Sequence, residues 1–226
     1  MKKITLLIAF ACLTTAMQAK IYVPGDRTFY PARIILQDGE SFECLVRIPT
    51  FPDNAVFYKM DASSKVIKQT LKQRDEPSPI RYILFMPVDD EPFLIEYIRR
   101  IDDIDNVMKK KPKMYNTWNQ VLIAGPVSLY TNYFGTSGTI KHLGAVHYVA
   151  KREGEHGVPM YYKNLTVENF RRKPKERKNK NFHKYAAAYF ADYPELAEKI
   201  VLKLPGYETQ DIVEIVREYN AKMSTN

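Results

Sequence analysis

Short apolar runs separated by turn residues fill most of this chain, and they limit the possible folds more than any other feature. The first two runs, 32–36 and 41–48, flank Asp38-Gly39, a dipeptide that accepts the positive φ angles of a tight hairpin turn. Further runs follow at 55–60, 66–71, 80–86 and 93–101, although the last also fits one face of a helix. Short strands broken by such turns favour a mainly antiparallel β body, arranged as a sandwich or barrel-like.

A second group of β-prone segments lies between residues 118 and 162. Residues 121–125 lead through a Gly-Pro bend into 126–130, and the runs at 145–151 and 158–163 continue the pattern. The aromatic residues of this region suggest a sugar- or peptide-binding face, but aromatics in strands are more often core residues and cross-strand pairs.

The last part of the chain changes to helical periodicity. Apolar residues recur at helical spacing over 182–190. Asp192 can cap a second helix that has Pro194 in its first turn, and Thr209 can cap a third. The sequence therefore predicts a module of about three helices over 182–222, and an α+β fold class for the whole chain.

The first nineteen residues have the pattern of a cleavable signal peptide. Lys2 and Lys3 precede an apolar run at 4–13, and a short stretch of mostly small or polar residues leads to Ala19. The run is too short to span a bilayer, which needs roughly 20 residues. A buried helix is the alternative, but it would show polar positions at helical spacing. We therefore expect cleavage after Ala19 or Ala16, no transmembrane segment afterwards, and an extracytoplasmic location that is periplasmic, secreted or at the cell surface.

Cleavage would change the cysteine content and the charge. It removes Cys12 and leaves Cys44 as the only cysteine, so no intramolecular disulfide can form. Cys44 lies in a strand-like run and is predicted to be a buried, small apolar residue. The formal net charge of +8 falls by two, because the removed segment holds two lysines and no acid. A basic exported protein is attracted to anionic surfaces, whereas most cytoplasmic nucleic-acid roles are excluded.

The densest positive charge lies just before the helical module. Its bases are Arg171, Arg172, Lys173, Lys175, Arg177, Lys178 and Lys180. Such a patch can bind an anionic glycolipid or lipid headgroup. A solvated linker is the preferred interpretation, because aromatic residues are not interleaved with the bases. The predicted organisation is a signal peptide at 1–19, a β-rich body at 20–170, a basic linker at 171–181 and a helical module at 182–222.

No pattern in the chain predicts catalysis or metal binding. The four histidines, His142, His147, His156 and His183, lack the spacing of a zinc site. The acids at 89–91 and 102–105 fit solvated turns better than two carboxylates held across a cleft. We therefore predict no catalytic residue, no metal and no cofactor, and keep a hydrolase with an unrecognised active site as the alternative.

Several short motifs carry a resemblance to a known family. They are the Asp-Gly hairpin, VLIAGPVSLY at 121–130, the strand at 147–151, YFADYPEL at 189–196 and the ending at 212–220. On these motifs the chain resembles a family of uncharacterised secreted and periplasmic proteins of Bacteroidetes-type bacteria, although Tyr193 stands where many relatives have Cys. The resemblance implies export, a β-rich body and a C-terminal helical tail, and it implies no known activity or site residue.

The expected function is that of an exported envelope protein with a binding, structural or accessory role. Its sheet faces or its basic linker would bind another envelope protein or an anionic glycolipid surface, and no nucleic acid is expected as a partner.

Overall fold

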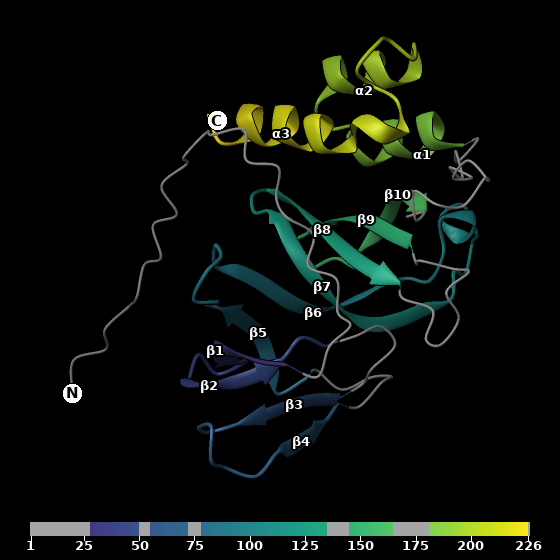
Figure 1. Cartoon of the computed structure of the whole chain (residues 1–226). Helices are drawn as coiled ribbons and strands as arrows, with labels where there is room; N and C mark the ends of the chain where they lie inside the picture. Colours follow the sequence, from purple (N-terminus) through teal and green to yellow (C-terminus); the bar gives the residue numbers. More distant parts are fainter. Residues whose placement is uncertain (1–27, 50–54, 72–77, 135–144, 165–180, 226) are drawn as a thin grey trace, which may run out of the picture.

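Figure 1 shows the computed structural model of the chain, which describes residues 28–49, 55–71, 78–134, 145–164 and 181–225. The strands are β1 (Phe29–Leu36), β2 (Ser41–Arg47), β3 (Ala55–Lys59), β4 (Ile67–Thr70), β5 (Ile80–Phe85), β6 (Phe93–Ile101), β7 (Met114–Ile123), β8 (Val127–Phe134), β9 (Ala145–Arg152) and β10 (Val158–Asn164). The helices are α1 (Phe182–Tyr189), α2 (Pro194–Val201) and α3 (Ile212–Met223), with short 3-10 turns η1 (Ile104–Asn106) and η2 (Thr209–Asp211). The predicted signal peptide and most of the basic linker lie outside the described residues.

The ten strands form one antiparallel sheet in the order β10-β9-β8-β7-β6-β5-β1-β2-β3-β4. Strands that follow each other in the chain are neighbours in the sheet, except that β5 pairs with β1 rather than with β4. This arrangement confirms the α+β class and the antiparallel body. The sheet is open rather than closed into a barrel, because β4 and β10 form its two ends.

The predicted hairpin and most predicted segments are present as expected. β1 and β2 pair around Asp38-Gly39, and Gly39 has a φ of +89°, which an L side chain rarely adopts. The segment 93–101, for which a helical face was the alternative, is the strand β6. β7 begins at Met114, earlier than the predicted start of the second β group at residue 118.

The three predicted helices are present, but two predicted caps are wrong. Tyr193, not Asp192, occupies the N-cap position of α2, while Pro194 stands in the first turn as predicted. Thr209 is buried inside η2, where the side chains of Glu208 and Asp211 form the capping box. α2 ends at Val201, which is 57% exposed. The large apolar residues that this helix buries are therefore Leu196 and Ile200.

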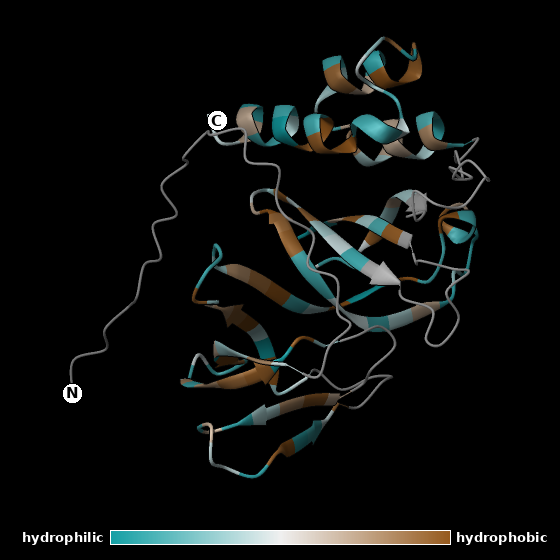
Figure 2. Cartoon of the chain, in the orientation of Figure 1, coloured by the Kyte–Doolittle hydropathy of each residue, from teal (hydrophilic) through white to brown (hydrophobic). Residues whose placement is uncertain are grey.

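One face of the sheet carries most of the buried apolar side chains of the strands, and we call it the apolar face. Residues alternate between faces along each strand, as the changes in hydropathy along the strands of Figure 2 illustrate. Toward β1–β5 this face forms a core around Ile34, Val46, Ile83 and Phe85. Toward β8–β10 it is covered by the helices. This second core contains strand and helix residues, among them Val127, Leu129, Ala150, Met160, Phe182, Phe190, Leu196, Ile200, Ile212 and Val216.

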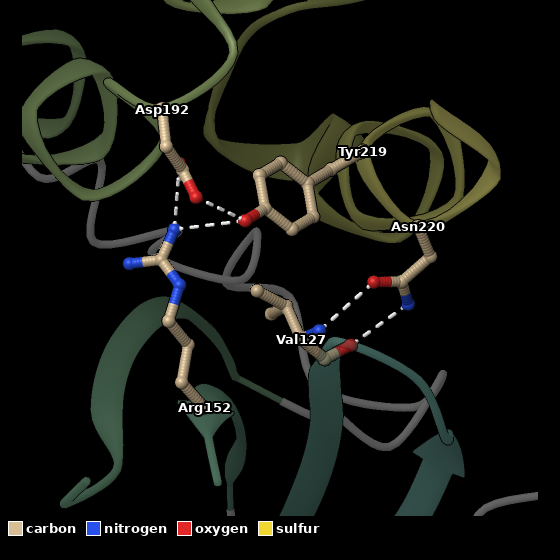
Figure 3. A network of polar contacts seen from close by, with 5 residues as sticks. All are labelled: Val127, Arg152, Asp192, Tyr219 and Asn220. Atoms are coloured by element: carbon tan, nitrogen blue, oxygen red, sulfur yellow. Dashed lines mark hydrogen bonds and ion pairs between the residues drawn. The ribbon is translucent and has the colours of Figure 1, made fainter. Parts of the chain in front are cut away.

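Polar contacts fix the helical module to the sheet (Figure 3). The Asn220 side chain of α3 bonds both backbone groups of Val127, accepting from its N–H at 2.9 Å and donating to its carbonyl at 2.8 Å. Arg152 of β9 donates to Asp192 at 2.8 Å and to the Tyr219 hydroxyl at 3.1 Å, and that hydroxyl donates to Asp192 at 2.5 Å. Asp192 therefore joins helix to sheet instead of capping α2.

The sheet coils in its C-terminal half, so that the start of β10 returns to the end of β6. Gly157 donates its N–H to the Arg99 carbonyl at 2.8 Å and accepts from the Ile101 N–H at 3.0 Å. A Cβ atom at Gly157 would lie 2.7 Å from a methyl group of Val149, which explains why glycine stands at this approach. We call β1–β5 the open half of the sheet and β6–β10 the coiled half.

In the described part of the chain, no helix has both the length and the apolar character that a membrane span requires.

Candidate functional site

The face opposite the apolar face carries cations, aromatic rings and buried polar groups, and we call it the mixed face. In the open half its residues follow from the strand registers and include Phe29, Arg33, Arg47, Phe57, Lys59, Lys68, Tyr82 and Leu84. In the coiled half they include Glu96, Ile98, Arg100, Tyr115, Tyr130, Asn132, His147, Val149 and Lys151. The same face is thus half-buried or exposed at one end of the sheet and mostly buried at the other.

Cations and aromatic rings alternate on the mixed face of the open half. The Phe57 ring lies between Arg47, 5.4 Å from its centroid, and Lys68, 5.7 Å from its centroid. Lys59 lies 5.1 Å from the centroid of Phe29. The three cations come from β2, β3 and β4 and none of them has an ion pair to a described carboxylate. Their charge is therefore available to an anion.

Arg33 extends this cationic region onto β1. Its guanidinium contacts Glu43 on β2 at 2.6 Å, and both side chains are largely exposed. An exposed ion pair of this kind contributes little to stability. An incoming anion can compete with Glu43 for the guanidinium at a small cost.

Glu96 lies on β6, where the open and coiled halves meet. Its carboxylate accepts a hydrogen bond from the Tyr130 hydroxyl at 2.5 Å and pairs with Lys151 at 3.5 Å. β8 and β9 are not neighbours of β6, so both contacts cross the coil of the sheet. Burial, followed by the charge of Glu96, raises the pKa of Tyr130 and also that of Tyr82, which stands opposite Glu96 on β5.

Arg100 is the most unusual residue of the coiled half, because it is 0% exposed. It donates to the Tyr115 hydroxyl and lies over the Tyr115 ring, with 4.9 Å to the ring centroid. Its two terminal nitrogens approach Nδ1 of His147 at 3.4 and 3.5 Å. The side chain forms no ion pair with a carboxylate of the described residues. Burial lowers the pKa of the guanidinium.

His147 is held as a neutral base by this neighbour. A guanidinium can only donate, so Nδ1 of His147 accepts and the ring proton resides on Nε2. Burial and then the positive charge of Arg100 lower the pKa of His147 to about 3. The ring packs edge-on against Tyr162, with 4.5 Å between centroids. A histidine with so low a pKa is a weak general base at neutral pH.

Cys44 is buried in the core of the open half, as predicted. Burial raises the pKa of its thiol to about 11, so the thiolate is scarce at neutral pH. The thiol therefore serves packing.

The remaining histidines and charged turn residues are dispersed. Lys109, Lys110 and Lys111 are exposed beyond η1, and Asp103 caps that turn. His183 contacts the Ile200 carbonyl, and His156 is exposed. Among the described residues, no three His, Cys, Asp or Glu side chains come together as a metal site.

The predicted anion-binding cations of the linker cannot be placed. Arg171, Arg172, Lys173, Lys175, Arg177, Lys178 and Lys180 all lie outside the described residues, as do His142 and the Gly-rich segment 135–138. The aromatic residues Trp118 and Tyr130, which could have belonged to a sugar-binding face, are buried. Trp118 forms a cross-strand pair with Tyr97, with 5.0 Å between the ring centroids.

Comparison of this chain with protein-family models, with curated proteins and with solved structures finds no match. The resemblance to secreted proteins of Bacteroidetes-type bacteria therefore stays a prediction.

The cationic and aromatic surface of the open half was not predicted from the sequence. Alternation places Phe57 and Lys59 on one face of β3, and this much is visible in the chain. The register that brings Arg47 and Lys68 to either side of Phe57 involves three strands, and only the folded sheet supplies it.

Proposed function

We propose that this protein is exported to the cell envelope and there binds an anionic glycolipid through the mixed face of its open half, without catalysing a reaction. The observation that carries the proposal is the group Arg47, Lys59 and Lys68 on three adjacent strands, interleaved with Phe29 and Phe57. Phosphate or carboxylate groups of a glycolipid would pair with these cations, and its apolar parts would contact the rings.

Two side chains with catalytic potential support a binding role over the hydrolase alternative. His147 has a pKa of about 3 and an arginine, rather than a carboxylate, beside its Nδ1. Cys44 has a pKa of about 11 and lies in an apolar core. Neither state suits a general base or a nucleophile at neutral pH.

Co-sedimentation with vesicles tests the binding proposal. Vesicles of a zwitterionic phospholipid, with and without lipopolysaccharide, are incubated with the mature protein. The triple variant R47Q/K59Q/K68Q is expected to lose about 100-fold in affinity for the lipopolysaccharide vesicles, because each cation near an anionic surface contributes about 1 kcal/mol. Wild-type protein should not co-sediment with the vesicles that lack lipopolysaccharide.

The matched control is K109Q/K110Q/K111Q, which removes the same charge from an exposed loop beyond the mixed face. It should retain most of the affinity. Equal losses of affinity in the two triple variants would mean that binding depends only on net charge. Unchanged binding by R47Q/K59Q/K68Q would indicate that the linker cations at 171–180 bind the glycolipid instead. Either result overturns the assignment to the open half.

Export is tested by the N-terminus of the protein recovered from cells. Cleavage after Ala19 predicts a mature chain that begins at Lys20, in the extracytoplasmic fraction. Mass spectrometry of fractionated cells measures this directly, and an intact Met1 in the cytoplasmic fraction would contradict the proposal.

A further inference from the structure

A second polar group lies on the mixed face beside the proposed anion-binding region, and its chemistry differs. Glu96 and Lys151 form an ion pair at 3.5 Å with side chains that are 13% and 18% exposed. Tyr82 stands opposite Glu96 on the neighbouring strand and is half-buried. The group therefore combines a carboxylate, an ammonium and an aromatic ring within reach of solvent.

This combination suits hydroxyl groups rather than anions. A sugar hydroxyl can donate to the carboxylate of Glu96 and accept from the ammonium of Lys151, which has three donors. Arg81 lies over the Tyr82 ring, 4.9 Å from its centroid, and the half-buried ring adds apolar surface for the carbon face of a sugar ring. A phosphate at the same place would be repelled by Glu96 and attracted by Lys151, so the pair has no net attraction for an anion and favours a neutral saccharide over an anionic headgroup.

A ligand that contacts both regions must be extended. The strands lie in the order β4-β3-β2-β1-β5-β6, so five inter-strand steps separate Lys68 from Glu96. At roughly 4.8 Å a step, these residues are about 24 Å apart across the sheet. Arg33 on β1 and Tyr82 on β5 lie between the two ends on the same face. A single phosphate headgroup cannot reach both ends, whereas an oligosaccharide can.

We propose that Glu96, Lys151 and Tyr82 bind the neutral saccharide part of the glycolipid, while Arg47, Lys59 and Lys68 bind its anionic part. This inference rests on the proposed function, and it adds that the ligand is recognised by its sugar hydroxyls and lies across the strands. Tyr130 is a positioning residue, because its buried hydroxyl donates to Glu96 at 2.5 Å and fixes the carboxylate.

Calorimetric titration with two probes tests the inference. One probe is the delipidated oligosaccharide released from lipopolysaccharide, and the other is a vesicle of phosphatidylglycerol, which is anionic and lacks a sugar chain. E96Q is expected to weaken binding of the oligosaccharide about tenfold, because it removes a charged acceptor. Its binding to phosphatidylglycerol should remain unchanged or increase slightly, since one negative charge is lost.

Y82A provides a second variant, because its side chain is half-buried and its removal leaves the Glu96–Lys151 pair in place. It should weaken oligosaccharide binding about tenfold and leave binding to phosphatidylglycerol unchanged. Unchanged oligosaccharide affinity in both variants, or equal losses with both probes, would overturn the saccharide assignment alone. Failure of the wild-type protein to bind either probe would overturn the proposed function as well.

Discussion

The open and coiled halves belong to one continuous sheet, yet they differ in how far the mixed face is buried. In the open half the apolar face forms the core and the mixed face is half-buried or exposed. In the coiled half both faces are buried, because helices cover the apolar face and the sheet coils around the mixed face. Strand alternation thus assigns a residue to a face, whereas the elements that cover that face decide whether the residue contacts water or protein.

The polar groups of the two halves consequently have different physical roles. Arg47 and Lys68 in the open half can bind a ligand because solvent reaches them. Arg100 in the coiled half is sealed. Its terminal nitrogens lie beside Tyr115 and His147 instead of a carboxylate, and its Nε has no hydrogen-bond partner among the described residues. A buried charge with neutral partners is costly, so this group makes the coiled half sensitive to changes in charge.

The largest effect is expected where the helices cover the coiled half. Phe190 is fully buried between the helices and the sheet. Truncation of Phe190 to alanine, F190A, should lower the free energy of unfolding by about 3–5 kcal/mol, because it leaves a cavity. Urea denaturation measures the change, and F85A in the open half, also fully buried, is the matched variant. A loss below about 1 kcal/mol for F190A would mean that the helices do not stabilise the coiled half.

Acid should selectively weaken the coiled half. The folded-state pKa of His147 is about 3, below its ordinary value of 6.5, so between these pH values the unfolded chain binds the additional proton. The contribution of His147 to the free energy of unfolding is therefore fully present above pH 6.5 and is lost as the pH is lowered, by about 3 kcal/mol at pH 4. The imidazolium would face the positive charge of Arg100, which opposes protonation.

H147Q is the control for the acid effect, because glutamine keeps an acceptor for Arg100 and does not titrate. Denaturation of both proteins between pH 7 and 4 should show a smaller loss for H147Q than for wild type. Parallel pH profiles would show that carboxylates elsewhere, rather than His147, cause the acid sensitivity.

A moderate effect is expected at the junction of α3 and β8. N220A leaves the N–H and carbonyl of Val127 without their side-chain partner in a buried environment, and we expect a loss of about 2 kcal/mol. Thermal denaturation measures it against K222A, an exposed position on the same helix. If N220A and K222A are equally stable, water replaces the amide at this junction and the contact is not structural.

The smallest effect on stability is expected on the mixed face of the open half. R33A breaks only the exposed pair with Glu43 and should change the free energy of unfolding by less than about 1 kcal/mol. The same variant should measurably weaken binding to lipopolysaccharide vesicles. A large loss of stability would show that this face is sealed like its counterpart in the coiled half.

Local sequence signals are sufficient to predict the strands and helices, but they do not predict every side-chain contact. Asp38-Gly39 specified its hairpin and Pro194 its helix start, because both depend on backbone angles that neighbouring residues set. The prediction that Asp192 caps α2 is wrong, because Arg152 and Tyr219, which are distant in the chain, bind its carboxylate instead. The candidate site was missed for the same reason, as Glu96 and Lys151 are 55 residues apart.

The sequence by itself determined the order of strands and helices and the two-residue alternation that separates the apolar from the mixed face. Both are properties of short segments, in which backbone preferences and hydrophobic spacing act locally. Tertiary structure alone decided that the sheet stays open, that it coils at Gly157, and that Arg100 is sealed while Arg47 stays within reach of solvent. These outcomes depend on strand register and on which element covers which face, and both arise from contacts between segments far apart in the chain.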